Sequence, residues 1–259
     1  MYRTLKHSKI KFFVILVIYL FFLNPSFADE VTKSSIEITA NKNMEWDQQE
    51  NKIVAQGDAQ VKTNNFIISA NIITGLYNGK LGKGNIKNLI ASENAKFSSE
   101  ETIIKASKID YDFINDIINV KGQNIEMTFK KGSISSEKSL IFYNQDNKIL
   151  VEGNVYIKMN NEGNIKAKNV TVNIDEKGGI SLVKAINDVE IFIGTLEQKV
   201  YSDEAIFDNK ASKINLMGNV VLVYGQSFIK GDKAFIDLEN GVSRISSDDK
   251  TNVSGLFIK

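Results

Sequence analysis

Alternating apolar and polar residues run along the chain from about residue 35 to its end. The clearest stretch is residues 213–222, where apolar side chains lie at even offsets on both sides of Gly218. A pleated strand would point all of them to one face, with an interruption at Gly218-Asn219. Apolar runs of this kind recur between turn signals, and no window of 3.6-residue periodicity is longer than two turns. The pattern predicts an all-β protein built from repeated antiparallel strand pairs.

The interrupted strand is repeated. Close copies occupy residues 52–61 and 148–157, and a looser copy occupies residues 117–125. In each copy an aromatic residue, followed by Asp or Asn, precedes the glycine by ten or eleven residues, with turn-forming residues between them. Each unit is therefore expected to be a strand, a tight turn and a second strand. Weaker breaks are predicted at residues 93–95 and 187–189.

The spacing of the glycines indicates a duplication. Gly57 and Gly122 are 65 residues apart, as are Gly153 and Gly218, and Gly57 and Gly153 are 96 apart. Fixed-period self-similarity of this kind is typical of repeat architectures. We expect one continuous body over residues 29–245, made of two tandem halves near 36–134 and 135–245. Residues 246–259 would be a C-terminal tail or a last strand.

The N-terminal segment has a different composition. Four basic residues precede an unbroken apolar run at 12–23, and Ser26-Phe27-Ala28 offers small residues for cleavage. This pattern predicts a cleaved signal peptide over residues 1–28 and an exported protein. The alternative is an uncleaved anchor, but twelve apolar residues fall short of the roughly 20 that a spanning helix needs.

Removing residues 1–28 changes the chemistry that is open to the chain. Residues 1–28 contain four of the 32 basic residues and none of the 31 acidic ones, so the net charge of the remaining chain is −3. They also contain the only His, and the whole sequence has no Cys. A Ser-His-Asp triad, a Cys nucleophile and a Cys/His zinc site are thus excluded. No basic stripe survives to bind nucleic acid. Carboxylate pairs such as Asp110/Asp112 and Glu100/Glu101 are interpreted as solvated strand and turn residues. We therefore expect no enzyme, no metal site and no cofactor.

The inward-facing residues of the repeats are the candidate functional residues. Stacked repeats would align them into a long apolar column, which is either a filled core or a trough that holds acyl chains. Composition does not choose between the two. The groove-facing candidates for lipid binding are Ile36, Ile38, Ile53, Ala55, Val61, Ile118, Val120, Ile149, Val151, Val155, Ile157, Ile214, Leu216, Val220 and Leu222.

The repeated phrase resembles the OstA-like, or LptA, family of lipopolysaccharide-transport proteins. The resemblance rests on Phe207-Asp208, the strand at 214–222, and Ile-Lys-Gly-Asp-Lys-Ala-Phe-Ile-Asp-Leu at 229–238 followed by Gly241. It covers most of residues 36–245, is strongest in the last 50 residues, and is weaker in the middle, where residues 121–123 lack the Asn-Val pair.

This resemblance implies a location in the periplasm, a fold and a function. The fold is an elongated, twisted, open β-jellyroll, and the function is to shield lipid A acyl chains in an apolar groove. The implied partners are lipopolysaccharide, an inner-membrane LptC-like protein, an outer-membrane LptD-like protein and further copies joined end to end, forming a bridge from inner to outer membrane. Two alternatives stay open: an inner-membrane anchored LptC-like component, and a structural β-solenoid or surface protein without a ligand.

Overall fold

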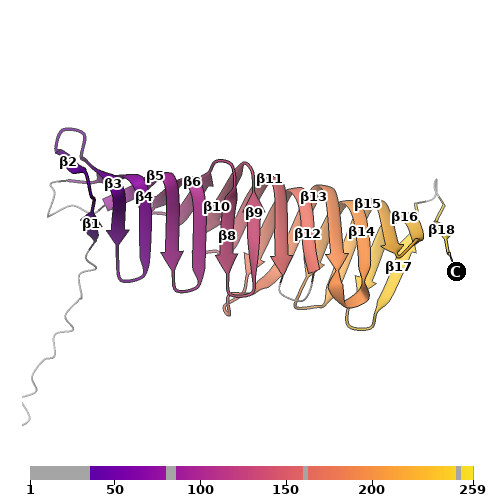
Figure 1. Cartoon of the computed structure of the whole chain (residues 1–259). Helices are drawn as coiled ribbons and strands as arrows, with labels where there is room; N and C mark the ends of the chain where they lie inside the picture. The colour runs from indigo at the N-terminus through magenta and orange to yellow at the C-terminus, as the bar shows by residue number, and fades with distance from the viewer. Residues whose placement is uncertain (1–35, 80–85, 160–162, 249–251, 259) are drawn as a thin grey trace, which may run out of the picture. The chain divides into compact units, whose positions relative to one another are not determined.

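The described part of the chain is almost entirely β-structure. The computed structural model describes residues 36–79, 86–159, 163–248 and 252–258, so the predicted signal peptide lies outside the described residues. Apart from one short 3₁₀ turn, every element in them is a strand (Figure 1). The elements are β1 Glu37–Thr39, β2 Asn43–Asp47, β3 Lys52–Lys62, β4 Phe66–Tyr77, β5 Ile86–Ser99, β6 Thr102–Asp112, β7 Ile117–Lys121, β8 Ile125–Phe129, β9 Gly132–Ser136, β10 Ser139–Tyr143, β11 Lys148–Met159, β12 Gly163–Ile174, β13 Ile180–Ile193, η1 Gly194–Leu196, β14 Gln198–Asp208, β15 Lys213–Tyr224, β16 Ser227–Asp237, β17 Val242–Ser246 and β18 Ser254–Leu256. The predicted all-β jellyroll built from repeated antiparallel strand pairs is confirmed.

Each long strand contributes to two layers, with one half in each layer. The first half of β3 pairs with β2 and with the second half of β4, whereas its second half pairs with β1 and with the first half of β4. The same exchange at mid-strand holds along the row. In the middle of the chain, two short strands take the place of one long strand. β7 and β8 together replace one long strand, because β6 pairs with both of them. β9 and β10 replace another, because β11 pairs with both of them. We call the layer that contains β2, β7, β10 and β17 layer 1, and the layer that contains β1, β8, β9 and β18 layer 2.

The chain crosses between the layers at corners that the sequence marks. The register of β15 with β16 shifts between Met217 and Val220, and Gly218 and Asn219 both have left-handed backbone, with φ of 76° and 48°. Gly153 and Asn154 repeat this geometry in β11, with φ of 88° and 46°. Two consecutive left-handed residues open a bulge that bends the strand. The repeated Gly-Asn and Gly-Asp pairs are therefore the points at which a strand leaves one layer and joins the other.

Neighbouring corners contact one another closely. An added Cβ at Gly57 would lie 2.5 Å from Cγ of Lys42, and one at Gly153 would lie 2.5 Å from Cβ of Lys138. These two pairs are 96 residues apart, which is the period of the sequence repeat. Glycine is required at these corners for its backbone freedom and because the preceding corner leaves no room for a side chain.

The two layers share one apolar core. Along β11 the buried positions alternate with exposed or half-buried ones on both sides of the corner. The resulting cluster runs through both layers from Ala55 in β3 to Ile236 in β16. Ser35–Lys259 forms one compact unit, and the boundary expected near residues 134 and 135 falls inside β9. The C-terminal segment contributes β18, which pairs with β16.

Candidate functional site

The predicted groove residues lie in the shared core. Twelve of the fifteen are buried, while Ile36, Ile38 and Ile53 are half-buried. The inward direction expected from the alternation is therefore found, but most of these side chains are packed against others. Three of the fifteen line a cavity of the described structure. Ile118 and Ile214 line the two interior cavities described below, and Val155 lines a shallower pocket formed by β11, β12 and β13.

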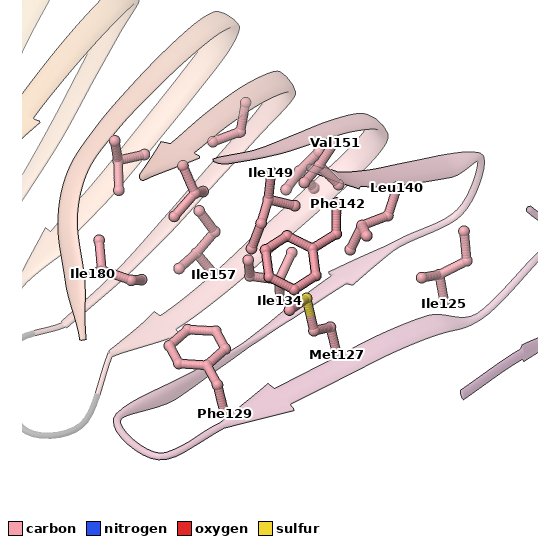
Figure 2. Close-up of a cluster of buried hydrophobic side chains, with 14 of the residues drawn as sticks. Ile125, Met127, Phe129, Ile134, Leu140, Phe142, Ile149, Val151, Ile157 and Ile180 are labelled. Carbon is pink, nitrogen blue, oxygen red and sulfur yellow. The ribbon is translucent and has the colours of Figure 1, made fainter. Parts of the chain in front are cut away.

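A cavity of about 900 Å³ opens between the layers, opposite the corners. We call it cavity 1. Its floor is apolar, because strands of both layers aim large side chains into it, and Met127 and Phe129 of β8 and Phe142 of β10 point toward one another (Figure 2). A volume of this size lies in the usual range for small-molecule sites, roughly 300–1,000 Å³. The apolar lining residues are Phe66, Phe97, Tyr111, Ile118, Met127, Phe129, Phe142 and Ile174.

A cluster of aromatic rings closes one end of cavity 1. Phe66 of layer 2 packs against Tyr111 of layer 1 with ring centroids 5.2 Å apart, and against Phe113 at 6.0 Å. Phe97 stacks on Phe66 at 5.3 Å and meets Tyr111 edge-on at 6.2 Å. The rings thus cross from one layer to the other at their open edge. We call Phe66, Phe97, Tyr111 and Phe113 the aromatic wall.

A hydrogen bond fixes Tyr111 within this wall. Its hydroxyl donates to Oδ1 of Asp116 at 2.7 Å, and Nδ2 of Asn144 donates to Oδ2 of the same carboxylate at 2.9 Å. Burial raises the pKa of Tyr111 well above its ordinary value, and the bond to Asp116 raises it further. The tyrosine therefore stays a neutral donor, and the ring is held in position by its polar end.

A second cavity between the layers, cavity 3, lies farther along the chain. Its volume is about 430 Å³, and Phe207 of β14, Ile214 of β15 and Leu238 after β16 line it. Residues from β11, β12 and β13 complete the apolar lining, including Met159, Ile165 and Ile191. Cavity 1 and cavity 3 have no lining residue in common. The column pattern in the sequence identified the inward direction, but the aromatic residues that shape these spaces were not among its candidates.

Aspartates at the ends of β2, β6 and β14 cap the turns that follow these strands. Oδ1 of Asp112 accepts from the backbone N–H groups of Ile114 and Asn115 at 2.8 and 3.1 Å, and these bonds, with one from the Asn115 amide, lower the pKa of Asp112. Asp47 and Asp208 cap their turns in the same way, as expected from Asx-turn chemistry. No group of three or more acidic or metal-ligating side chains suited to a metal lies within the described residues.

The row of strands ends in two exposed edges. In the described residues, β1 and β2 pair with β3 alone, and β17 and β18 pair with β16 alone. Apolar side chains are exposed at both edges, with Trp46 at 49% in β2 and Phe257 at 73% beyond β18. Unpaired edges of this kind are templates for adding a strand from another chain. No helix in the described residues could cross a membrane.

Fold and interior together define an all-β, OstA-like jellyroll with an apolar core between two layers. Residues 134–242 match the family described as "LptA/(LptD N-terminal domain) LPS transport protein", so this part of the chain is similar to the LptA-type domains of lipopolysaccharide-transport proteins. Proteins of this family are not generally enzymes.

The other comparisons add little to this assignment. A structure of LptH, described as the LptA homologous periplasmic component of the conserved lipopolysaccharide transport device from Pseudomonas aeruginosa, is similar at 9% identity and a TM-score of 0.22, covering 87% of this chain and 96% of that chain. An overlap this loose supports no conclusion about function. A search of the curated proteins finds no match.

Proposed function

We propose that the protein is a periplasmic lipopolysaccharide-binding component that shields lipid A acyl chains between its two layers and forms part of a head-to-tail bridge from the inner to the outer membrane. The observation that carries the proposal is the pair of cavities, each with a floor of large apolar side chains, inside a core shared by both layers. Transport of this kind needs no chemistry, since shielding acyl chains from water is itself favourable at about 0.8 kcal/mol per buried CH₂.

The exposed edges support the bridging part of the proposal. A copy that presents β17 and β18 to β1 and β2 of the next copy would satisfy backbone groups that are otherwise unpaired among the described strands. Strand addition supplies main-chain hydrogen bonds, while the exposed apolar residues supply contact area. An inner-membrane LptC-like protein and an outer-membrane LptD-like protein would occupy the two ends by the same mode.

Photo-crosslinking in cells tests lipid binding. A benzophenone amino acid replaces Phe129, Phe142 or Phe207, whose aromatic side chains already line the cavities. We expect lipopolysaccharide to be captured at these positions and not from Tyr201, which is 38% exposed and does not line either interior cavity. Capture at none of the three interior positions would instead support the ligand-free structural solenoid.

The anchored LptC-like alternative differs at the N-terminus. N-terminal sequencing of the exported protein decides between the two, because cleavage after residue 28 gives a free periplasmic protein. An intact apolar run at residues 12–23 would show the anchored form.

A further inference from the structure

One hairpin of layer 1 reaches across to layer 2. Residues 175–179 join β12 to β13, whose adjoining halves lie in layer 1. A Cβ placed on Gly178 would nevertheless lie 3.3 Å from Oε2 of Glu101 and 3.9 Å from Cβ of Lys130. Both of those residues belong to turns of layer 2, at the ends of β5 and β8. The hairpin, which we call the strap, therefore crosses the open edge between the layers.

The strap covers cavity 1. Asp175, Glu176 and Gly178 are part of the cavity lining, together with the facing turn of layer 2 at residues 99–102. Without the strap, this side of the cavity would open directly to solvent between the two rows of turns.

The strap is stiff in itself but loosely attached. Oδ1 of Asp175 accepts from the backbone N–H groups of Lys177 at 2.8 Å and Gly179 at 2.9 Å, and the Asp175 N–H donates to the Gly179 carbonyl at 2.7 Å. Among the described residues, no hydrogen bond or ion pair joins the strap to the turns of layer 2. Its links to the opposite layer are van der Waals contacts and the attraction between the Asp175 carboxylate and Lys131. A unit with internal bonds and so few links across the edge can swing without breaking its own structure.

We propose that cavity 1 binds the acyl chain of an amphiphile, which enters sideways through the open edge when the strap swings away. The apolar floor matches an unbranched hydrocarbon chain. The aromatic wall stops that chain at one end, because Phe66 and Tyr111 bridge the layers there. This inference rests on the proposed function, since lipopolysaccharide supplies such chains, and it adds the site and the route of entry.

A disulfide lock tests the route. The chain contains no cysteine, so the pair Lys130→Cys and Gly178→Cys introduces the only two thiols. The distance of 3.9 Å between their Cβ positions lies within the disulfide range of about 3.5–4.5 Å. Each single variant is a matched control, because Gly178→Cys alone carries the same left-handed backbone strain (φ 72°) without the bond.

The probe is cis-parinaric acid, a fluorescent fatty acid, added to the purified protein. We expect oxidation of the empty double variant to slow its uptake at least tenfold, and dithiothreitol to restore it. Oxidation after loading should slow release by a similar factor, whereas both single variants should respond to neither reagent. Equal uptake by the locked and reduced forms, or no uptake by the wild type, would overturn the proposal.

A second variant covers the case in which the double variant folds poorly. Replacing residues 175–179 by Asn-Gly gives Ile174 and Ile180, which are already paired, a two-residue hairpin turn. Removing the strap should accelerate both uptake and release of the probe, and unchanged rates would contradict the proposal. Lipopolysaccharide capture at Phe129 and Phe142 is a separate readout, so the proposed function can survive the failure of this route.

Discussion

The amide of Asn219 donates to the carboxylate of Asp203 at 2.9 Å, and this bond joins the corner of β15 to the corner of β14. Asp203 also lies directly over Gly218, where an added Cβ would be 2.9 Å from Cβ of Asp203. Asn154 repeats the arrangement through its bond to the Glu137 carboxylate. The corners are thus fastened to one another in series along the fold.

Gly218→Ala should destabilise the protein by more than the backbone conformation alone requires. A left-handed L-residue costs roughly 1–2 kcal/mol, and the contact with Asp203 adds to that. Gly225→Ala is the matched control, because Gly225 is also left-handed (φ 58°) but its added Cβ meets nothing within 4 Å. Urea unfolding should place Gly218→Ala about 1–2 kcal/mol below the control. Equal losses would show that the corner contact is unimportant.

The corners show how far the sequence predicts this fold. Breaks without glycine were expected at residues 93–95 and 187–189, and Glu93, Asn94, Asn187 and Asp188 all have left-handed backbone, with φ of 65°, 60°, 67° and 53°. The position of a corner can be predicted from the local sequence, because it depends on which residues tolerate positive φ. Alternation likewise predicts which side chains point inward.

The cavities and the strap could not be predicted in the same way. Val151 and Ile118 have the same inward pattern, yet only Ile118 lines a cavity. Free space depends on the summed volume of side chains from both layers, which are far apart in sequence. Residues 175–179 include two glycines, but nothing in this local sequence shows that the hairpin reaches Glu101 and Lys130 of the other layer.

Ile149→Ala should cost about 2–5 kcal/mol, the usual range for a fully buried isoleucine. Ile149 is completely buried in β11, between its neighbours Phe142 and Val172. Ile114→Ala makes the same chemical change at a position that is 66% exposed and should cost about 0.5 kcal/mol or less. Chemical unfolding of both variants measures the difference. A small loss at Ile149 would indicate that the core between the layers is loosely packed there.

Acid should weaken the protein through its turn aspartates. The pKa of Asp112 is lower in the folded chain than its ordinary value of about 3.9. The ionised side chain therefore stabilises the folded protein at pH values above about 3.9. The contribution is lost as the pH falls below about 3.9 and through the folded pKa. The urea midpoint of Asp112→Asn should therefore lie below that of the wild type at pH 7, and the gap should close towards pH 2.

Asp146→Asn is the control for this pH dependence. Asp146 lies in the turn between β10 and β11, is exposed, and has no side-chain hydrogen bond in the described structure. The variant removes the same charge without removing a turn bond. If both variants lower the midpoint at pH 7 equally, net charge and not the Asp112 turn explains the effect.

Tyr111→Phe isolates the polar anchor of the aromatic wall. The substitution keeps the ring contacts with Phe66 and Phe113 but removes the bond to Asp116, so we expect a loss of about 1 kcal/mol. The hydroxyl of Tyr143 has no hydrogen bond in the described structure, so Tyr143→Phe should leave the free energy of unfolding almost unchanged. Because the pKa of Tyr111 is raised, the stability linked to its neutral form should fall as the pH rises above about 10. Absorbance titration should show one tyrosine ionising last, and Tyr111→Phe should remove it.

The edge at β18 gives a direct test of head-to-tail assembly. Leu256 is 48% exposed on a strand that pairs with β16 alone among the described strands. A lysine on an edge strand opposes pairing with another chain, because its charge would be desolvated at the junction. Leu256→Lys should weaken self-association in sedimentation velocity at least tenfold. Ile114→Lys adds the same charge at an exposed turn and should leave association unchanged. If Leu256→Lys assembles like the wild type, this edge is not the junction, and the edge at β1 and β2 would need a partner other than β18.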